Sequence, residues 1–369
     1  MKDLAPQTSG RNGRARELVL IRAALEAEQA CLEPIAMNRA PLFRAYLFRL
    51  DAEDHVMLLV MHDSIIDGWS MAIFMEELSE LYAASIEDRK AELTEPALQF
   101  SDFARWQRGW STRSEANRQF DYWKRRLDEA SPPFTAPKSN VGGELISRVA
   151  QQRFQISDDL LAQLNALSRS RGVTRFMSLL AGFKTLLLLK SGRNDICVAT
   201  SMANRCQPRT ERVIGPFANT TLIRTQLDAD LTFGEALLRV REAVLEAYAR
   251  QELPFDTIVT RLAEETGLHS ASLVQVYFAL QAAFRQPLKL PGVKAGSFDY
   301  QEGRSAMPID RAWLSITLKE TPTGITGICG HKTDLFAPDT VVHWAADYTA
   351  ILAKAAANPD TQLGRLAEL

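Results

Sequence analysis

Cysteine and histidine are scarce in this chain, and their spacing does not suit a metal site. The 369 residues include four cysteines and five histidines. No two cysteines form a CxxC pair, and no two histidines lie four residues apart. Structural zinc sites use closely spaced ligands, and disulfide-stapled folds use many cysteines in a short chain. We therefore expect neither a metal site nor a disulfide framework.

A surplus of charge of either sign is also missing. Lysine and arginine total 43 against 45 aspartate and glutamate residues, which gives a formal net charge of −2. Proteins that bind nucleic acid or anionic membranes usually present a strongly basic surface. The balance argues against both kinds of partner.

Long hydrophobic runs are absent as well. The most apolar helical stretch, residues 176–189, is interrupted by Lys184, and the first 13 residues contain no apolar segment of the kind found in signal peptides. A membrane span needs about 20 consecutive apolar residues. The sequence therefore predicts a cytoplasmic protein without a membrane span.

The length suggests two domains or lobes, with a single large α/β domain as the other option, because domains usually contain about 100–200 residues. The first 15 residues are rich in turn-forming types and predict a loose tail. Residues 131–145 contain Pro132-Pro133 and Gly142-Gly143, which break every periodic pattern and predict a linker. We accordingly expect an N-terminal lobe over 16–130 and a C-terminal lobe over 146–369.

The pattern of the first lobe predicts helices around a strand hairpin. A helix is expected over 16–30, with no strand ahead of it, and two strands over 43–50 and 55–61 are joined by a polar turn. The second strand is almost continuously apolar and should be buried on both faces. An amphipathic helix follows Trp69, and a further helical stretch covers 101–127.

The second lobe alternates strands and helices, so the fold class is α/β. Thr232 and Glu235 form a capping box that predicts a long helix reaching Arg250. The expected strands are 149–156, 195–201, 220–227, 273–280, 313–319 and 325–330, and the other expected helices are 158–168, 175–190 and 339–357.

Polar residues cluster at residues 62–70, directly after the buried strand 55–61. Side chains at the end of a buried strand are natural candidates for a functional site. A structural interpretation is also open, in which Asp67-Gly68 forms a turn, Asp67 or Ser70 caps the next helix, and His62 is simply a partly buried histidine. The pattern of this stretch alone favours the structural interpretation.

The segment His62–Gly68 resembles the HHxxxDG motif of nonribosomal peptide synthetase condensation domains, which belong to the chloramphenicol-acetyltransferase-like superfamily. Three further blocks follow in the family's order, and the resemblance extends from about Arg16 to the C-terminus. They resemble the aromatic-x-Asp-Phe-Ala-x-Trp, IGxFVNTxxxR and HQDxPFE blocks and lie at 100–106, 214–224 and 250–256.

The resemblance implies an α/β fold of two chloramphenicol-acetyltransferase-like lobes in a V-shaped pseudo-dimer, here with an incomplete first lobe. It implies amide-bond formation between a carrier-bound acyl or peptidyl thioester and an aminoacyl amine. Donor and acceptor peptidyl carrier proteins would then be the partners, with adenylation or tailoring enzymes as others. The 4'-phosphopantetheine would be attached to those carriers, and neither a metal nor a covalent cofactor is expected on this chain.

The resemblance also assigns roles to individual residues. His62 takes the position of the first histidine, Asp67 that of the structural aspartate that pairs with an arginine, and Gly68 that of the glycine close to the reaction intermediate. The second histidine, the family's candidate base, is replaced here by Asp63. Further structural residues at the site are expected to be Trp69, Ser70, Asn219 and Arg224.

Three departures from the family pattern stand out. A carboxylate titrates near pH 3.9 and an imidazole near 6.5, so Asp63 is a weaker base and predicts reduced rather than absent activity. The family's opening blocks have no counterpart before Met61, so with Met1 as the true start Asp67 would lack its arginine. The RDxSRNPL-like block survives only as 268–273. Together these losses predict a decaying or repurposed domain.

Related branches of the family lead to one rival hypothesis. Heterocyclisation domains replace the first histidine, which is present here as His62, and epimerisation domains differ in the block at 214–224. The recruiting domains of glycopeptide assembly lines also lose the second histidine and bind oxygenases without condensing anything. The alternative to an impaired acyltransferase is therefore an inactive module that docks a carrier protein or a tailoring enzyme.

Overall fold

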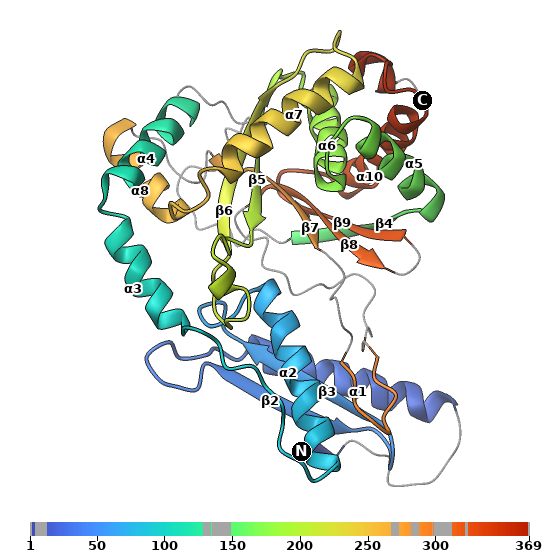
Figure 1. Cartoon of the computed structure of the whole chain (residues 1–369). Coiled ribbons are helices and arrows are strands. Elements are labelled where there is room, and N and C mark those ends of the chain that lie inside the picture. The colour runs from blue at the N-terminus through green and yellow to red at the C-terminus, as the bar shows by residue number, and fades with distance from the viewer. Residues whose placement is uncertain are drawn as a thin grey trace. The chain divides into compact units, whose positions relative to one another are not determined.

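The computed structural model describes residues 2–3, 13–127, 134, 149–266, 273–281, 288–296, 298, 312–321 and 324–367 (Figure 1). It divides into two compact units. Unit 1 comprises Met1–Arg105, Arg205–Ala218 and Phe284–Arg304, and unit 2 comprises Trp106–Asn204, Asn219–Ala283 and Ser305–Leu369.

These boundaries differ from two consecutive lobes. Unit 2 begins at Trp106, and the segments 205–218 and 284–304 return to unit 1 after unit 2 has begun. The early start of unit 2 follows from packing, because Phe120 and Trp123 are buried in its hydrophobic core. The linker expected at 131–145 lies outside the described residues, apart from Phe134.

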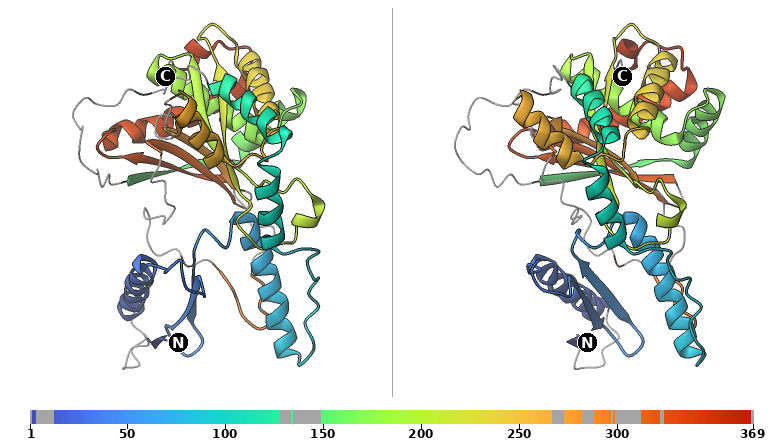
Figure 2. Two further views of the ribbon diagram at one scale, coloured as in Figure 1. Left: turned by 90° about the vertical axis from the view of Figure 1, so that its left-hand side faces the viewer. Right: turned by 60° about the vertical axis from the view of Figure 1, so that its left-hand side comes forward.

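Unit 1 contains a small sheet in the order β1-β2-β3, with helix α1 packed against it (Figures 1 and 2). β2 and β3 form the expected antiparallel hairpin, with Phe43 opposite Met61 and Arg49 opposite His55. The elements of this part of the chain are β1 (Lys2–Asp3), α1 (Gly13–Leu32), β2 (Phe43–Arg49), β3 (His55–Met61), α2 (Gly68–Ile86) and α3 (Phe100–Trp110), which ends in unit 2.

Two expectations for unit 1 were wrong. A strand does precede the first helix, since β1 pairs in parallel with β2 through Lys2 opposite Phe48 and Asp3 opposite Arg49. Most of the expected loose tail, residues 4–12, lies outside the described residues.

The expected burial of β3 on both faces was also wrong. One face of the hairpin packs around Phe48, which is fully buried with Ala23 of α1. On the other face Phe43 is 46% exposed and Met57 is 42% exposed, because none of the described elements covers these side chains. A continuous apolar run thus predicts a strand here, and the neighbours of the strand determine its burial.

Unit 2 is built on a six-stranded mixed sheet in the order β4-β9-β8-β7-β5-β6. β7 pairs in parallel with β5 and β8, and the other pairs are antiparallel. The strands are β4 (Val149–Ile156), β5 (Asp195–Met202), β6 (Asn219–Gln226), β7 (Val276–Gln281), β8 (Leu314–Thr321) and β9 (Gly324–Lys332). Each of the six expected strands is present within a few residues.

Helices α5, α6, α7 and α10 lie together along one side of this sheet (Figures 1 and 2). Thr232 and Glu235 make the expected capping box of α7. The helices of unit 2 are α4 (Ser114–Leu127), α5 (Asp158–Ser170), α6 (Arg175–Ser191), α7 (Phe233–Tyr248), α8 (Phe255–Thr266) and α10 (Pro338–Ala357), with the short helices η1 (Pro208–Thr210), which is in unit 1, and η2 (Leu363–Ala367).

The helical stretch expected over 101–127 is two helices, since α3 ends at Trp110 and α4 begins at Ser114. Trp110 and Trp123 are buried in the core of unit 2. Within the described residues, no helix by itself has the length and apolarity of a membrane span. Only α5 and α6 taken together reach that composition, and they meet at an angle of 106°.

Candidate functional site

The motif residues 62–70 connect β3 to α2 within unit 1. Asp67 is the N-cap of α2, with extended backbone angles and a side-chain oxygen that accepts a hydrogen bond from Ser70 N at 2.7 Å. The capping role in the structural interpretation is therefore confirmed. An N-cap carboxylate satisfies one of the free amides of the first helical turn and interacts favourably with the helix dipole.

The Asp67 carboxylate has further donors on the segment 205–218. Its Oδ2 accepts hydrogen bonds from Phe217 N at 3.0 Å and Ala218 N at 3.1 Å, and its Oδ1 lies 3.2 Å from the guanidinium of Arg205. Only 6% of the Asp67 side chain is exposed. A buried carboxylate with this many donors is compensated and fixed in orientation.

Arg205 corrects the expectation that Asp67 lacks its arginine. The expectation placed that arginine in a missing N-terminal block, whereas the structure supplies it from 138 residues further along the chain. The Arg205 side chain is 2% exposed and also donates to Val213 O at 2.8 Å. Burial lowers the pKa of Arg205 and the nearby Asp67 carboxylate raises it, but arginine titrates so far above neutrality that the pair is ionic.

Ser70 joins this ion pair to Gly215. Its hydroxyl donates to Gly215 O at 2.8 Å and accepts from Gly215 N at 3.0 Å and from Arg205 at 2.7 Å. Ser70 is completely buried. With one donor and two acceptor positions filled, the hydroxyl is fully satisfied, so the network costs little to bury.

Aromatic packing brings a third motif block to the same place. The Phe100 and Phe103 rings lie 5.1 Å and 4.6 Å from the ring of Phe217. A Cβ atom at Gly215 would approach the Phe100 ring to 2.4 Å, which explains why glycine is required there. The blocks at 62–70, 100–103 and 214–218 thus form one structure within unit 1.

Gly68 and Trp69 form the accessible side of this structure. Both are exposed, and no described atom lies within 4 Å of a Cβ built on Gly68. Trp69 donates its indole N–H to Glu211 O at 2.9 Å, and the Arg205 guanidinium carbon lies 5.8 Å from its ring centre. Glycine at this position therefore serves neither packing nor an unusual backbone conformation.

His62 and Asp63 differ in their hydrogen bonding. The Nδ1 atom of His62 accepts a hydrogen bond from Ser64 N at 3.1 Å and contacts Ser64 Oγ at 2.9 Å. This assigns the proton of the neutral ring to Nε2. Asp63 is exposed, and its carboxylate has no hydrogen bond or ion pair with any residue that the structure describes. Among the described contacts of the motif, its lone pairs are therefore free to accept a proton.

Asn219 and Arg224 lie in unit 2 and have structural contacts. Asn219 donates to the carbonyls of Gln251 and Leu253 at 2.8 and 2.9 Å and accepts from Phe255 N at 3.0 Å, which fixes the block at 250–256. Arg224 makes a bidentate pair with Asp195 at 2.6–3.0 Å and donates to Arg126 O. These contacts hold both residues within the fold of unit 2.

Lys184 is a buried cation that the sequence analysis noted only as an interruption. Its Nζ donates to Ile196 O at 2.8 Å and Ile223 O at 2.6 Å in the core of unit 2. Burial lowers the pKa of Lys184 to about 7, and burial raises the pKa of the neighbouring Cys197 to about 11. Both groups lie within packed helix and strand, so we assign them to the core.

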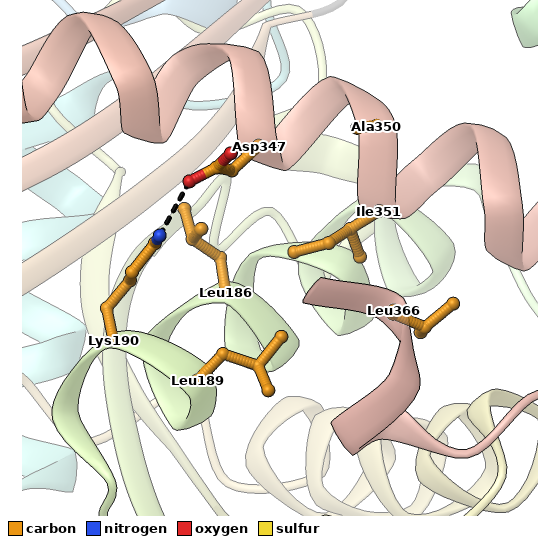
Figure 3. Close-up of a pocket in the computed structure, with 7 residues that line it drawn as sticks. All are labelled: Leu186, Leu189, Lys190, Asp347, Ala350, Ile351 and Leu366. Carbon is orange, nitrogen blue, oxygen red and sulfur yellow. Dashed lines mark ion pairs between the residues drawn. The ribbon is translucent and has the colours of Figure 1, made fainter. Parts of the chain in front are cut away.

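Other features of the described chain offer no second site. Among the described residues, no three His, Cys, Asp or Glu side chains are grouped to hold a metal ion. A shallow pocket of unit 2 lies between α6, α10 and η2, and its lining includes the ion pair of Lys190 and Asp347 at 2.6 Å (Figure 3). The other lining residues are apolar, and none of the predicted site residues is among them.

Comparisons with known proteins identify the family. The Condensation domain family matches residues 14–368, so the chain belongs to the condensation domains of nonribosomal peptide synthesis. One of the linear gramicidin synthase proteins from Brevibacillus parabrevis is 36% identical over 344 residues, covering 91% of this chain and 7% of that protein. This chain spans less than a tenth of the three gramicidin synthase proteins that it matches.

Solved structures agree with this assignment. The SgcC5 protein from Streptomyces globisporus is 26% identical with a TM-score of 0.77, and the match covers 98% of this chain and 81% of that one. The X-domain from teicoplanin biosynthesis is 25% identical with a TM-score of 0.75, covering 92% and 78%. The expected condensation-domain resemblance and α/β fold class are thus confirmed.

Arg205, Gly215 and Phe217 are the site residues whose contacts the sequence analysis did not predict. The only sequence signal for Arg205 was its place just after a buried strand, at 195–202. The block at 268–273, where a further family motif was expected, lies outside the described residues except for its last residue.

Proposed function

We propose that this chain is a condensation-domain acyltransferase with reduced activity. It would form an amide bond when the amine of an acceptor attacks a carrier-bound acyl or peptidyl thioester. The observation that supports this most strongly is the buried network of Asp67, Arg205 and Ser70, which fixes the motif loop while Gly68 stays accessible. A positioned loop aligns reactants, and alignment alone supplies much of the rate of such reactions.

The hydrogen bonds of the motif suggest roles for its polar side chains. Since Nδ1 of His62 already accepts a hydrogen bond, the Nε2 proton of the neutral ring is the group that can face a ligand. Asp63 has free lone pairs and takes the role of proton acceptor for the attacking amine. A carboxylate is a weaker base than an imidazole, so this role accounts for the reduced activity.

Asp63→His tests this proposal directly. We expect the variant to form amide from a thioester and a free amine at least about tenfold faster than the parent chain, because the rate of general-base catalysis rises with the strength of the base and an imidazole is a stronger base than a carboxylate. The measurement is the single-turnover rate with surrogate substrates at pH 7.5.

Asp63→Asn is the matched control, since it preserves the shape of the side chain and removes its basicity. The proposal predicts the rate order histidine, aspartate, asparagine. If all three chains are equally inactive and still bind carrier proteins, this chain is not an acyltransferase.

Gly68→Val should separate activity from stability. The space beside Gly68 is open, so the free energy of unfolding should change by less than about 1 kcal/mol, because glycine and valine differ by less than this in helix propensity. The transfer rate should fall at least tenfold, because the new methyl groups occupy the space that we assign to the thioester. Denaturant unfolding and the transfer assay, applied to one preparation, would measure both quantities; a fully active variant would show that the thioester binds elsewhere.

The partners follow from the proposed reaction. Donor and acceptor carrier proteins would deliver the two substrates, and 4'-phosphopantetheine would arrive attached to these carriers. An inactive docking module is the second candidate. Two observations favour it. Asp63 replaces the second histidine of the motif, and the chain is similar to the X-domain from teicoplanin biosynthesis, which is also known as a complex with OxyB. In that case a carrier protein or a tailoring enzyme would bind without turnover.

A further inference from the structure

Trp69 remains accessible beside Gly68 although it is a large aromatic residue. It is 43% exposed. Its orientation is nevertheless fixed, because its indole N–H donates to Glu211 O at 2.9 Å. A side chain that is already immobilised loses little conformational entropy when a ligand packs against it. Exposed, anchored tryptophans are for this reason common at binding sites.

The surroundings of Trp69 indicate what kind of ligand suits it. The Arg205 guanidinium carbon lies 5.8 Å from the ring centre and is paired with Asp67, so this arginine leaves no unpaired positive charge beside the ring. The adjacent Gly68 presents no side chain, and the space beside it is open. An accessible ring next to bare backbone fits a slender, uncharged ligand that has both apolar and amide groups.

We infer that Trp69 packs against the pantetheine arm of a carrier-bound thioester and so positions the thioester carbonyl beside Gly68. The inference rests on the proposed function, because that function places the thioester at Gly68. The arm has the required chemistry, with a branched apolar segment and two amides and no charge in this part. It is also the constant part of the substrate, and a ring of fixed orientation suits a constant partner better than a variable acyl group.

Two thioesters with the same acyl group test this assignment in Trp69→Leu. For the pantetheine thioester we expect KM to rise about tenfold with kcat changed less than twofold, since one aromatic contact is lost. For the N-acetylcysteamine thioester, which lacks most of the arm, KM should change less than twofold. Equal rises for the two thioesters, or a fall in kcat alone, would overturn the assignment.

Trp69→Phe separates ligand contact from a structural role. Phenylalanine retains an aromatic face and loses the hydrogen bond to Glu211. Its KM for the pantetheine thioester should stay within about threefold of the parent value. If the phenylalanine and leucine variants are equally impaired, the indole hydrogen bond matters rather than ring contact, and the inference is wrong.

Binding can be measured without turnover. An unreactive pantetheine amide should bind about tenfold more weakly to Trp69→Leu than to the parent chain, as followed by ligand-observed NMR. This result would support the role of Trp69 even if no chain forms amide, so the failure of the proposed reaction remains distinguishable. Unchanged binding would contradict the inference.

Discussion

Replacing Arg205 with methionine is expected to lower the free energy of unfolding by about 3–5 kcal/mol. The substitution leaves the Asp67 carboxylate buried without its countercharge, and breaking one partner of a buried ion pair typically has this cost. Ser70 and the carbonyl of Val213 lose a donor at the same time. Urea unfolding followed by circular dichroism would measure the change.

Arg212→Met is the matched control on the same segment. Arg212 pairs with Glu76 at 2.7 Å, but 42% and 49% of the two side chains are exposed. Solvent-exposed ion pairs contribute roughly 0–1 kcal/mol, so this variant should be nearly neutral. A double variant, Arg205→Met with Asp67→Asn, should recover part of the lost stability. Equal effects of the two arginine substitutions would show that burial of the Asp67 pair has little importance.

Lys184→Met should change how stability depends on pH. The folded pKa of Lys184 is about 7 and the ordinary value is 10.5, a difference that corresponds to about 5 kcal/mol when the whole range is crossed. Below pH 7 both the folded and the unfolded chain hold the proton, and the cost of burying the cation is fully present. Between pH 7 and 10.5 only the unfolded chain holds it, so stability rises with pH in this window.

The methionine variant lacks this cost and should be more stable than the parent at pH 6. Its advantage should shrink by about 3 kcal/mol between pH 7 and 9, as measured by denaturant unfolding at each pH. The range stops at pH 9 because burial raises the pKa of Cys197 to about 11, which makes stability fall with pH above that point. Lys190→Met is the control, because Lys190 is partly exposed at the end of the same helix. Parallel pH curves for the parent and Lys184→Met would contradict the shift.

Local patterns predicted most of the secondary structure. The Thr232–Glu235 capping box and the apolar spacing of α2 and α6 depend on residues within one or two helical turns, so they are visible in the sequence. The hairpin of β2 and β3 follows from its short polar turn in the same way. β1 was missed because two residues are too few to show a pattern, and its pairing depends on β2.

The site was predicted only in part, for a physical reason. The capping role of Asp67 is local, whereas its partner Arg205 is set by tertiary folding and left no periodic signal. The anchoring of Trp69 depends likewise on where the segment 205–218 lies. The family resemblance identified the motif residues. The contacts that hold these residues in place are set by tertiary folding and are visible only in the structure.

The pairing of Asp67 with a distant segment has a consequence for biosynthesis. Its partners Arg205, Phe217 and Ala218 are 138, 150 and 151 residues away in the chain. Synthesis proceeds at roughly 5–20 residues per second, so a nascent chain waits on the order of ten seconds between making Asp67 and making Ala218. For most of that interval, until Arg205 is made, the carboxylate has none of these long-range donors. Chains released before residue 217 therefore lack the backbone donors Phe217 and Ala218 for Asp67, whatever helices and strands they have already formed.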